Sequence, residues 1–174
     1  MKVSIITAVY NRKDTLAQAI ESVQSQSYRD IEHIIQDGGS TDGSVDVIKK
    51  MSNSRTFWES KPDMGIYNAI NRGIARARGD AIGLLHSDDF YTSANVIDKV
   101  VSALEDNRIN FVYGDLQYVS ASYQSKIIRH WVAGDYSKEK LRRGWMPPHP
   151  TVFVRREVFD NFGVYDESYK ISAD

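Results

Sequence analysis

The sequence predicts a single α/β domain built on a mostly parallel, three-layer sheet. Short apolar runs alternate with segments of helical periodicity as far as residue 113. Parallel neighbours in a sheet require crossover connections, and these are most often helical. The chain has 174 residues, of which 41% are hydrophobic, and this is enough for one substantial core. No internal repeat, low-complexity segment or linker divides residues 1–174.

Each strand and helix can be placed from its periodicity. Apolar runs predict strands at residues 3–7, 31–36, 56–59, 81–86, 109–113 and 151–154. Helices are predicted from apolar positions three or four residues apart, namely Leu16, Ile20 and Val23; Val45, Ile48 and Met51; Tyr67, Ile70 and Ile74; and Val96, Ile97, Val100, Val101 and Leu104. Gly79 is expected to stop the third helix. Two alternating segments in residues 116–132 indicate an antiparallel hairpin, and a short helix is expected after residue 154.

Composition excludes several classes of protein. Lys and Arg number 22 against 23 Asp and Glu, so the chain lacks the basic footprint of a nucleic-acid-binding protein. The absence of cysteine excludes a disulfide scaffold and a cysteine metal site, and it fits a reducing compartment. The N-terminal apolar run is too short for a signal peptide, and no stretch approaches the length of a membrane span. We therefore expect a domain on the cytoplasmic side.

Acidic residues recur directly after the predicted strands. Asp37, Asp63, the pair Asp88 and Asp89, and Asp115 all follow apolar runs. Ligands of open parallel sheets bind outside the carboxyl ends of the strands, so these side chains are expected at one edge. Carboxylates gathered there repel one another unless a cation is bound, and such oxygen donors suit Mg²⁺ or Mn²⁺. The sequence therefore predicts a divalent metal that holds an anionic ligand.

The turn after the first strand narrows the identity of that ligand. A nucleotide diphosphate is the expected anion for this architecture, but residues 7–11 contain no glycine. The Gly-x-Gly-x-x-Gly turn of dinucleotide-binding dehydrogenases and the P-loop are therefore both absent. We expect a diphosphate to be held by the metal instead of by a glycine-rich turn.

Four motifs, in this order and spacing, resemble those of the family 2 glycosyltransferases. They are "VSIITAVYNRKDTLAQAIESVQSQSY", "DGGSTDGS", "SKPDMGIYNAINRGIARARGD" and "GLLHSDD", and the resemblance covers essentially the whole chain. It implies the GT-A fold, a three-layer Rossmann-like sheet with a C-terminal antiparallel, acceptor-side part. It also implies an inverting transferase in polysaccharide biosynthesis. Such an enzyme moves a sugar from a nucleotide-diphosphate sugar, expected to be UDP-linked, to a glycan or lipid-linked acceptor.

The resemblance implies roles for residues on the donor side. Thr7 and Tyr10 would line the base pocket, with Tyr10 stacking on the ring. Asp37 would accept a hydrogen bond from the base, and Asp88 would bind the ribose. Secondary nucleotide contacts are expected from Asp63, Gly65 and Asn71.

The resemblance also places the metal. Asp89 would be the metal ligand of the family's Asp-x-Asp motif, but the first position of that motif is Ser87 in this chain. Only the last two positions are acidic. We therefore expect ligation by one protein carboxylate, the diphosphate and water, and weak binding of the metal alone.

Sugar transfer also requires a base on the acceptor side. Displacement at the anomeric carbon develops negative charge on the diphosphate, which a metal at Asp89 would offset as a Lewis acid. The acceptor hydroxyl must lose its proton to a base as it attacks. The resemblance places that base at the end of the segment "GVYDESYKISAD", which indicates Asp174. The next candidates are His149, which the resemblance predicts to be an acceptor-site residue, and Asp115. Relatives continue past this position. We therefore expect a domain truncated at its C-terminus, with residues 1–115 as the nucleotide-sugar-binding half and residues 116–174 as the acceptor-side half.

Other interpretations of these residues stay open. Asp37 and Asp42 would also suit a turn that caps the following helix, and Asp88 and Asp89 would suit a helix cap. His149 would also fit a loop without a functional role. At the level of function, a sugar nucleotidyltransferase would need a glycine- and arginine-rich loop after the first strand, which is missing. A non-catalytic nucleotide-sugar-binding domain is the other alternative, because the chain stops at the proposed base.

A cluster of cations lies near the C-terminal third of the chain. Lys138, Lys140, Arg142 and Arg143 surround Leu141 on a predicted short helix. Such a cluster is usually a solvated face, but it also suits anionic lipid head groups. The second interpretation predicts peripheral contact with the inner face of the membrane.

Overall fold

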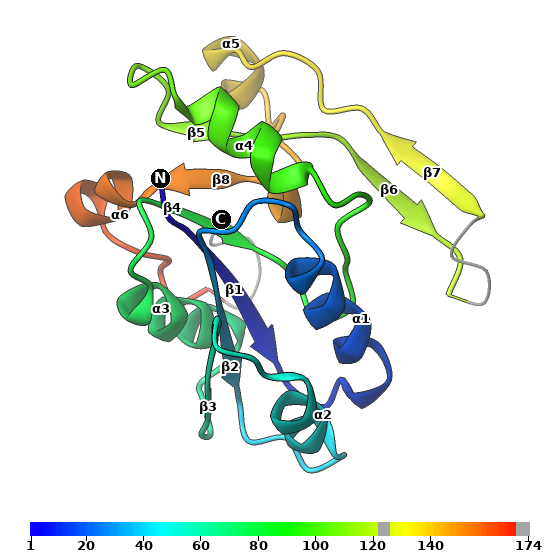
Figure 1. The fold of residues 1–174 in the computed structure, drawn as a ribbon. Coiled ribbons are helices and arrows are strands. Elements are labelled where there is room, and N and C mark those ends of the chain that lie inside the picture. The colour runs from blue at the N-terminus through cyan, green and yellow to red at the C-terminus, as the bar shows by residue number, and fades with distance from the viewer. Residues whose placement is uncertain (122–125, 170–174) are drawn as a thin grey trace.

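The computed structural model describes residues 1–121 and 126–169 (Figure 1). Its main sheet has six strands. In sheet order these are β3 (Thr56–Ser60), β2 (Ile31–Asp37), β1 (Val3–Val9), β4 (Ala81–Leu84), β8 (Phe153–Arg155) and β5 (Phe111–Val112). The helices are α1 (Lys13–Gln24), α2 (Ser44–Met51), α3 (Ile66–Arg76), α4 (Val96–Leu104), α5 (Lys138–Arg142) and α6 (Arg156–Phe162), and η1 (His149–Thr151) is a 3-10 turn. Strands β6 (Leu116–Val119) and β7 (Ile127–Trp131) form a separate hairpin.

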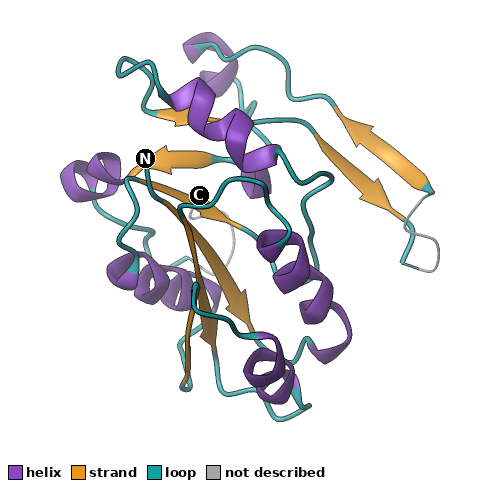
Figure 2. Cartoon of the chain, in the orientation of Figure 1, coloured by secondary structure: helices purple, strands orange, loops and turns teal. Residues whose placement is uncertain are grey.

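Helices cover both faces of the main sheet (Figure 2). Side chains alternate along a strand, so Val3, Ile5 and Val9 of β1 point to one face and Ile6 points to the other. The first face packs against α1, α2 and α4, whereas Ile6 packs against α3 through residues such as Ile70. The predicted three-layer α/β fold is confirmed. All residues of β2 are buried, as is typical of a central parallel strand.

The C-terminal half, predicted to be the acceptor side, contributes a strand to the main sheet. β1 pairs in parallel with β2 and β4, and β2 pairs in parallel with β3. β8 instead lies antiparallel between β4 and β5. Gly83 of β4 makes this insertion possible, because a Cβ atom there would lie 2.3 Å from Cε1 of Phe153. The predicted halves 1–115 and 116–174 therefore share one sheet and one core.

Several predicted boundaries were wrong. The strand predicted at residues 81–86 ends at Leu84, and the strand predicted at residues 109–113 is only Phe111–Val112. Gly79 does not stop α3, which ends at Arg76. Gly79 is needed instead where the chain passes β1, because a Cβ atom at this position would lie 2.6 Å from the backbone nitrogen of Ser4. The last strand begins at Phe153, two residues later than expected, because residues 149–151 form the turn η1.

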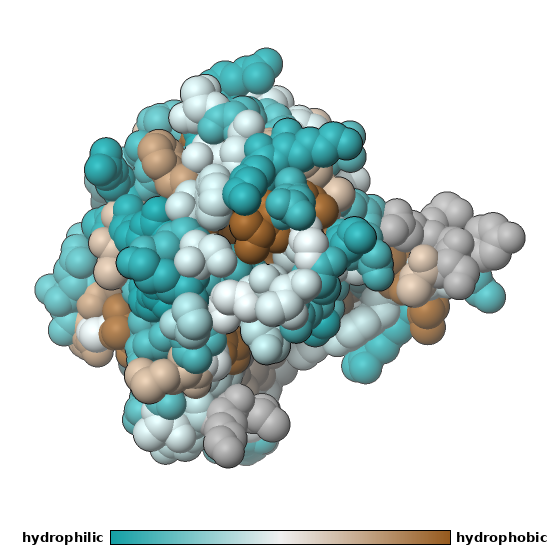
Figure 3. Space-filling view, turned by 90° about the horizontal axis from the view of Figure 1, so that it is seen from below, coloured by the Kyte–Doolittle hydropathy of each residue, from teal (hydrophilic) through white to brown (hydrophobic). Residues whose placement is uncertain are grey.

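The predicted hairpin is confirmed. β6 and β7 are antiparallel, with Leu116 opposite Trp131 and a register shift at Tyr118 and Val119. In Figure 3, which views the molecule from below, the hairpin extends to one side of the body and exposes hydrophobic side chains. Ile127 and Ile128 are 52% and 67% exposed. The hairpin therefore contributes little to the core.

Candidate active site

A cavity of about 560 Å³ opens at the carboxyl ends of the parallel strands. It is formed by the segments that follow β1, β2, β3 and β4, together with the first turns of α3. Tyr10, Asp63, Gly65 and Asp88 all line it. The structure thus brings together four of the residues predicted to contact the nucleotide, although they come from three separate segments of the chain.

The turn after β1 is shaped without glycine. Asn11 adopts a left-handed conformation with φ of 52°, which asparagine tolerates better than most residues. Its backbone nitrogen donates to Ser40 Oγ at 2.8 Å, and its Oδ1 accepts from the Thr41 nitrogen at 2.9 Å. These bonds tie the turn after β1 to the turn after β2. The two walls of the cavity are therefore held at a fixed spacing.

Two side chains of the β1 turn face the cavity in complementary ways. Tyr10 is 63% exposed, and its ring offers a flat surface of the kind on which nucleobases stack. Arg12 also lines the cavity and brings a permanent cation to it. Arg12 is not among the residues predicted from the sequence, although a basic residue just after the first predicted strand was a usable signal. A base and a diphosphate would find complementary groups on the same turn.

Asp37 is engaged inside the turn that follows β2. Its Oδ2 atom accepts from the backbone nitrogens of Gly39 and Ser40, both at 3.0 Å, and from Ser60 Oγ at 2.6 Å. Its Oδ1 atom accepts from Ser40 Oγ. The residue is fully buried and does not line the cavity. Turn shaping is thus its observed role, and contact with a base stays a prediction.

Asp42 shapes the turn before α2, which is one of the roles that the sequence left open, although the N-cap residue itself is Gly43. Its Oδ1 accepts from the nitrogen and the hydroxyl of Ser44, at the start of α2, and its Oδ2 accepts from the Lys13 nitrogen at the start of α1. The hydrogen bond from the Ser44 side chain, followed by that from Lys13, lowers the pKa of Asp42 to about 2. One carboxylate therefore orients two helix N-termini behind the cavity.

Asp63 is held against the β2 turn by two glycines. A Cβ atom at Gly38 would lie 2.5 Å from Asp63 Oδ2, so only glycine allows this approach. Asp63 Oδ1 accepts from the Gly65 nitrogen at 2.9 Å, and Gly65 has a φ of 117°, which disfavours other residues. The position of Asp63 in the cavity wall therefore depends on local backbone geometry.

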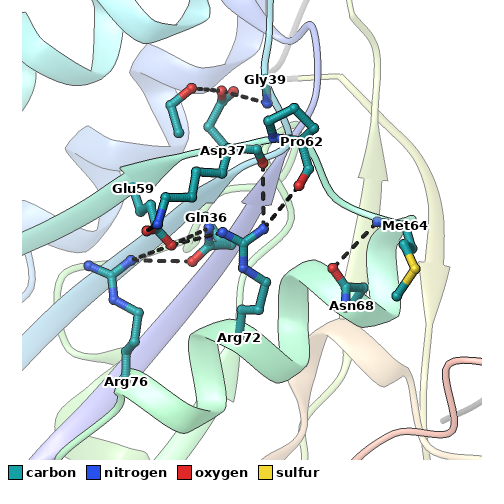
Figure 4. A network of polar contacts seen from close by, with 11 residues as sticks. Gln36, Asp37, Gly39, Glu59, Pro62, Met64, Asn68, Arg72 and Arg76 are labelled. Atoms are coloured by element: carbon teal, nitrogen blue, oxygen red, sulfur yellow. Dashed lines mark hydrogen bonds and ion pairs between the residues drawn. The ribbon is translucent and has the colours of Figure 1, made fainter.

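A network of charged groups beneath the cavity supports the loop that carries Asp63 (Figure 4). Arg72 of α3 donates to Glu59 Oε2 at 2.9 Å and to the Pro62 carbonyl at 3.3 Å. Lys61 pairs with the other oxygen of Glu59 at 2.5 Å. The hydrogen bonds from Lys61 and then Arg72 lower the pKa of Glu59 to about 2. The network joins β3 to α3 and fixes the loop between them.

Thr7 does not line the cavity. Its side chain is fully buried, and its Oγ1 lies 3.0 Å from Nε2 of the buried His33 on the neighbouring strand β2. Alternation along β1 directs Thr7 toward the face that α1, α2 and α4 cover, and the cavity begins only at Ala8 and Val9, the last residues of the strand. The expected place of Thr7 in the base pocket is therefore not supported by this arrangement.

Asp88 and Asp89 lie in a tight turn after β4. The turn is closed by a hydrogen bond of 3.0 Å from the Asp89 nitrogen to the His86 carbonyl. Asp88 is exposed and faces the cavity, whereas Asp89 is partly buried and faces a second cavity. Burial raises the pKa of Asp89. The charge of His86 acts in the opposite direction, and the charge of Asp88 raises the pKa further. Neither residue caps α4, which begins at Val96.

This donor set fits a weakly held divalent ion. Among residues 1–121 and 126–169, no group of three or more His, Asp or Glu side chains converges in a way that would complete a protein-only site. Asp88, at the edge of both cavities, and Asp89, which lines the second, nevertheless offer adjacent hard oxygen donors, and neither has a Lys or Arg ion-pair partner among the described residues. The remaining positions would have to come from a ligand and water, as the sequence predicts.

A second cavity, of about 1100 Å³, adjoins the first at Asp88. Its walls are mostly apolar and come from α4, the β6–β7 hairpin and η1. His149 and Asp115 line it, and the rings of His149 and His86 lie 5.4 Å apart. Asp115 Oδ1 accepts from the Ala133 nitrogen at 2.8 Å, so this carboxylate supports the end of the hairpin. His149 is thus placed beside the acidic turn.

The last two predicted site residues are Asn71 and Asp174. Asn71 lines neither cavity, and its side chain contacts the segment around Tyr165. Asp174 lies outside the described residues.

The sheet order, the cavity at its carboxyl edge and the paired carboxylates match the predicted α/β domain of the GT-A type. The family model "Glycosyl transferase family 2" matches residues 4–163. The chain therefore belongs to glycosyltransferase family 2.

Curated relatives agree with this assignment. An uncharacterized glycosyltransferase of Mycobacterium tuberculosis is 33% identical over 177 residues, an alignment that covers 99% of this chain and 65% of the relative. WfaP of Escherichia coli, a UDP-Glc:alpha-D-GlcNAc-diphosphoundecaprenol beta-1,3-glucosyltransferase, is 36% identical over 169 residues, covering 96% of this chain and 64% of WfaP. The chain thus spans slightly less than two thirds of the length of these relatives.

Solved structures show the same fold. S. aureus TarS 1–349 in complex with UDP-GlcNAc matches with a TM-score of 0.77 at 17% identity, over 100% of this chain and 51% of that one. The mannosyltransferase PcManGT from Pyrobaculum calidifontis, in complex with GDP-Man and Mn²⁺, matches with a TM-score of 0.74 at 14% identity, over 95% and 48% of the two chains. The predicted GT-A fold is confirmed.

Proposed function

We propose that this chain is the sugar-transferring domain of an inverting glycosyltransferase that uses a UDP-linked sugar. The observation that carries the proposal is the meeting of two cavities at Asp88. One cavity has an exposed aromatic ring, a cation and carboxylates, and the other is larger and mostly apolar. A donor in the first and an acceptor in the second would meet beside the acidic turn.

The donor cavity offers a group for each part of a UDP-sugar. Tyr10 stacks on the base, Asp88 binds the ribose, and Arg12 lies near the diphosphate. Asp63 and Gly65 complete the wall at the start of α3. The complexes of TarS with UDP-GlcNAc and of PcManGT with GDP-Man and Mn²⁺ support a nucleotide sugar as the ligand class.

Asp89 would hold Mg²⁺ or Mn²⁺ together with the diphosphate. Such an ion supplies Lewis-acid stabilisation of the negative charge that develops on the leaving group. The proton of the acceptor hydroxyl needs a carboxylate base on the opposite side of the sugar, and Asp174 stays the proposed residue. His149 would contact the acceptor at the junction of the cavities.

We propose a saccharide or a lipid-linked saccharide as the acceptor. The name of WfaP gives a diphosphoundecaprenol-linked acceptor for that relative. An apolar second cavity suits the hydrophobic part of such a molecule. Conversion of a polyprenyl-diphosphate sugar, compared with that of the free sugar, distinguishes the two acceptor classes.

Contact with a membrane surface is proposed for α5. None of the described helices has the length and hydrophobicity to cross a bilayer. Lys138, Lys140, Arg142 and the 40% exposed Leu141 give α5 the character of a helix that lies on an anionic surface. Co-sedimentation with phosphatidylglycerol vesicles, but not with phosphatidylcholine vesicles, is expected for the chain. A Lys140→Glu, Arg142→Glu variant should lose it, whereas Lys49→Glu, Lys50→Glu on α2 should not.

The metal assignment gives the direct test of the donor site. Asp89→Asn should weaken UDP binding in the presence of Mn²⁺ about tenfold or more, since loss of one charged partner costs at least about 1.4 kcal/mol. Titration calorimetry with and without Mn²⁺ measures this. Asp46→Asn, an exposed carboxylate on α2, is the matched control. Unchanged, metal-dependent affinity in Asp89→Asn would contradict the proposal. Turnover with an acceptor then separates an enzyme from a binding domain.

A further inference from the structure

One face of α3 is used by the donor cavity and another by the C-terminal segment. Ile66 and Ala69 line the donor cavity, whereas Asn68 and Asn71 contact residues 165–167. The two asparagines are three residues apart and so lie on one side of the helix. The helix that shapes the donor site therefore also anchors the described end of the chain.

The Asn71 side-chain amide forms two hydrogen bonds with the backbone of Tyr165, one as acceptor and one as donor. Its Oδ1 accepts from the Tyr165 nitrogen at 3.1 Å, and its Nδ2 donates to the Tyr165 carbonyl at 2.8 Å. Nδ2 also donates to Glu167 Oε1 at 2.9 Å. Both Nδ2 hydrogens are thus committed to protein partners, and the amide replaces the pairing that a neighbouring strand would give. An aspartate has the same shape, but it lacks the donor.

A second asparagine strengthens this attachment. Asn68 Nδ2 donates to Glu167 Oε2 at 2.8 Å, so the Glu167 carboxylate is held by both asparagines. The segment also closes on itself, because the Ser168 nitrogen donates to Asp166 Oδ1 at 2.9 Å. The position of residues 165–168 is therefore set mainly by α3.

Aromatic contacts link Tyr165 to His149 on the acceptor side. The Tyr165 ring stacks on Tyr67 with centroids 5.8 Å apart and lies edge-on to His149 at 6.4 Å. His149 in turn lies against His86, in the turn that carries Asp88. A displaced Tyr165 would remove the support on one side of the His149 ring.

We propose that Asn71 is a positioning residue that fixes Tyr165, and through it His149, at the junction of the two cavities, and that it does not bind nucleotide. The role of His149 toward the acceptor rests on the proposed function. The attachment of Tyr165 by Asn71 does not, and it is measurable without turnover.

Hydrogen–deuterium exchange tests the attachment directly. Asn71→Asp should speed exchange in residues 163–169 about tenfold or more, because the Tyr165 carbonyl and Glu167 would then face an acceptor in place of a donor. Asn68→Ser should give a smaller increase, and Asn161→Ser, on the exposed side of α6, none. Equal protection in Asn71→Asp and the unaltered chain would overturn the proposal. A less disruptive Asn71→Ser variant covers the case in which Asn71→Asp fails to fold.

Binding and kinetics separate positioning from a nucleotide contact. UDP affinity with Mn²⁺ should stay within about twofold in Asn71→Ser, whereas Asp63→Asn, in the donor cavity, should weaken it. In transfer assays Asn71→Ser should lower kcat or raise KM for the acceptor and leave KM for the donor unchanged. A tenfold loss of UDP affinity in Asn71→Ser would restore the nucleotide role and overturn this inference. Absence of turnover in the unaltered chain would count against the proposed function alone, since exchange and UDP binding still test Asn71.

Discussion

Residues 1–115, the proposed donor side, and the described part of residues 116–174, the proposed acceptor side, differ in how their geometry is maintained. Six of the seven residues of β1 and every residue of β2 are buried, whereas β6 and β7 have no buried residue. Helices α1–α4 all contribute buried side chains, and α5 and α6 contribute none. The geometry of the donor side is therefore maintained by packing in the hydrophobic core. The acceptor side depends on a few individual contacts, such as those of Asn71.

This difference predicts where substitutions act. Turns that follow buried parallel strands have little freedom, because the packed strand before each turn and the packed helix after it fix its two ends. A change there should lower the free energy of unfolding. A comparable change on the acceptor side should leave stability almost unaltered, because few packed groups depend on it.

The largest effect is expected for the turn after β2. Asp37→Ala removes a buried carboxylate that accepts four hydrogen bonds, so the backbone nitrogens of Gly39 and Ser40 lose their acceptor. The free energy of unfolding should fall by about 4 kcal/mol, measured by urea denaturation. Asp166→Ala, in an exposed turn of similar chemistry, should cost less than about 0.5 kcal/mol. Equal losses would remove the distinction between the two sides.

The pH dependence of stability gives the second effect. Burial lowers the pKa of His33 from 6.5 to about 3. Below pH 6.5 the unfolded chain binds a proton that the folded chain excludes, so stability present above pH 6.5 is lost as the pH falls toward 3. The slope should approach 1.4 kcal/mol per pH unit, or about 3 kcal/mol between pH 6.5 and 4. His33→Gln should flatten this part of the curve in urea titrations. An unchanged slope would show that His33 is not the group responsible.

The smallest effect concerns the place where the two sides interlock. Gly83→Ala would set a Cβ atom against the Phe153 ring of β8 and should lower the free energy of unfolding by about 2 kcal/mol. Gly114→Ala is the matched control, because no atom lies within 4 Å of a Cβ at that position. Thermal melts of both variants measure the difference. If Gly83→Ala is neutral, β8 does not pack against β4 as the structure shows.

Most of the fold was predictable because each element carries its own pattern. The strand-helix alternation, the β6–β7 hairpin and the clustering of Tyr10, Asp63 and Asp88 all follow from local periodicity and from the rule that strand ends meet at one edge. The insertion of β8 between β4 and β5 did not follow. The short apolar run of β8 predicts only that the strand is buried. No nearby residue of the sequence indicates that it pairs with β4 and β5.

The sequence by itself determined the class of the protein and the edge of the sheet at which the cavity opens, because composition, periodicity and motif spacing are local properties. Only the tertiary structure decided what individual polar side chains do. Thr7 is buried beside His33, Asp37 accepts hydrogen bonds from its own turn, and Asn71 donates to Tyr165, which lies 94 residues away in the sequence. A polar residue takes its role from the partner that satisfies its hydrogen bonds, and that partner is chosen by the packing of distant segments.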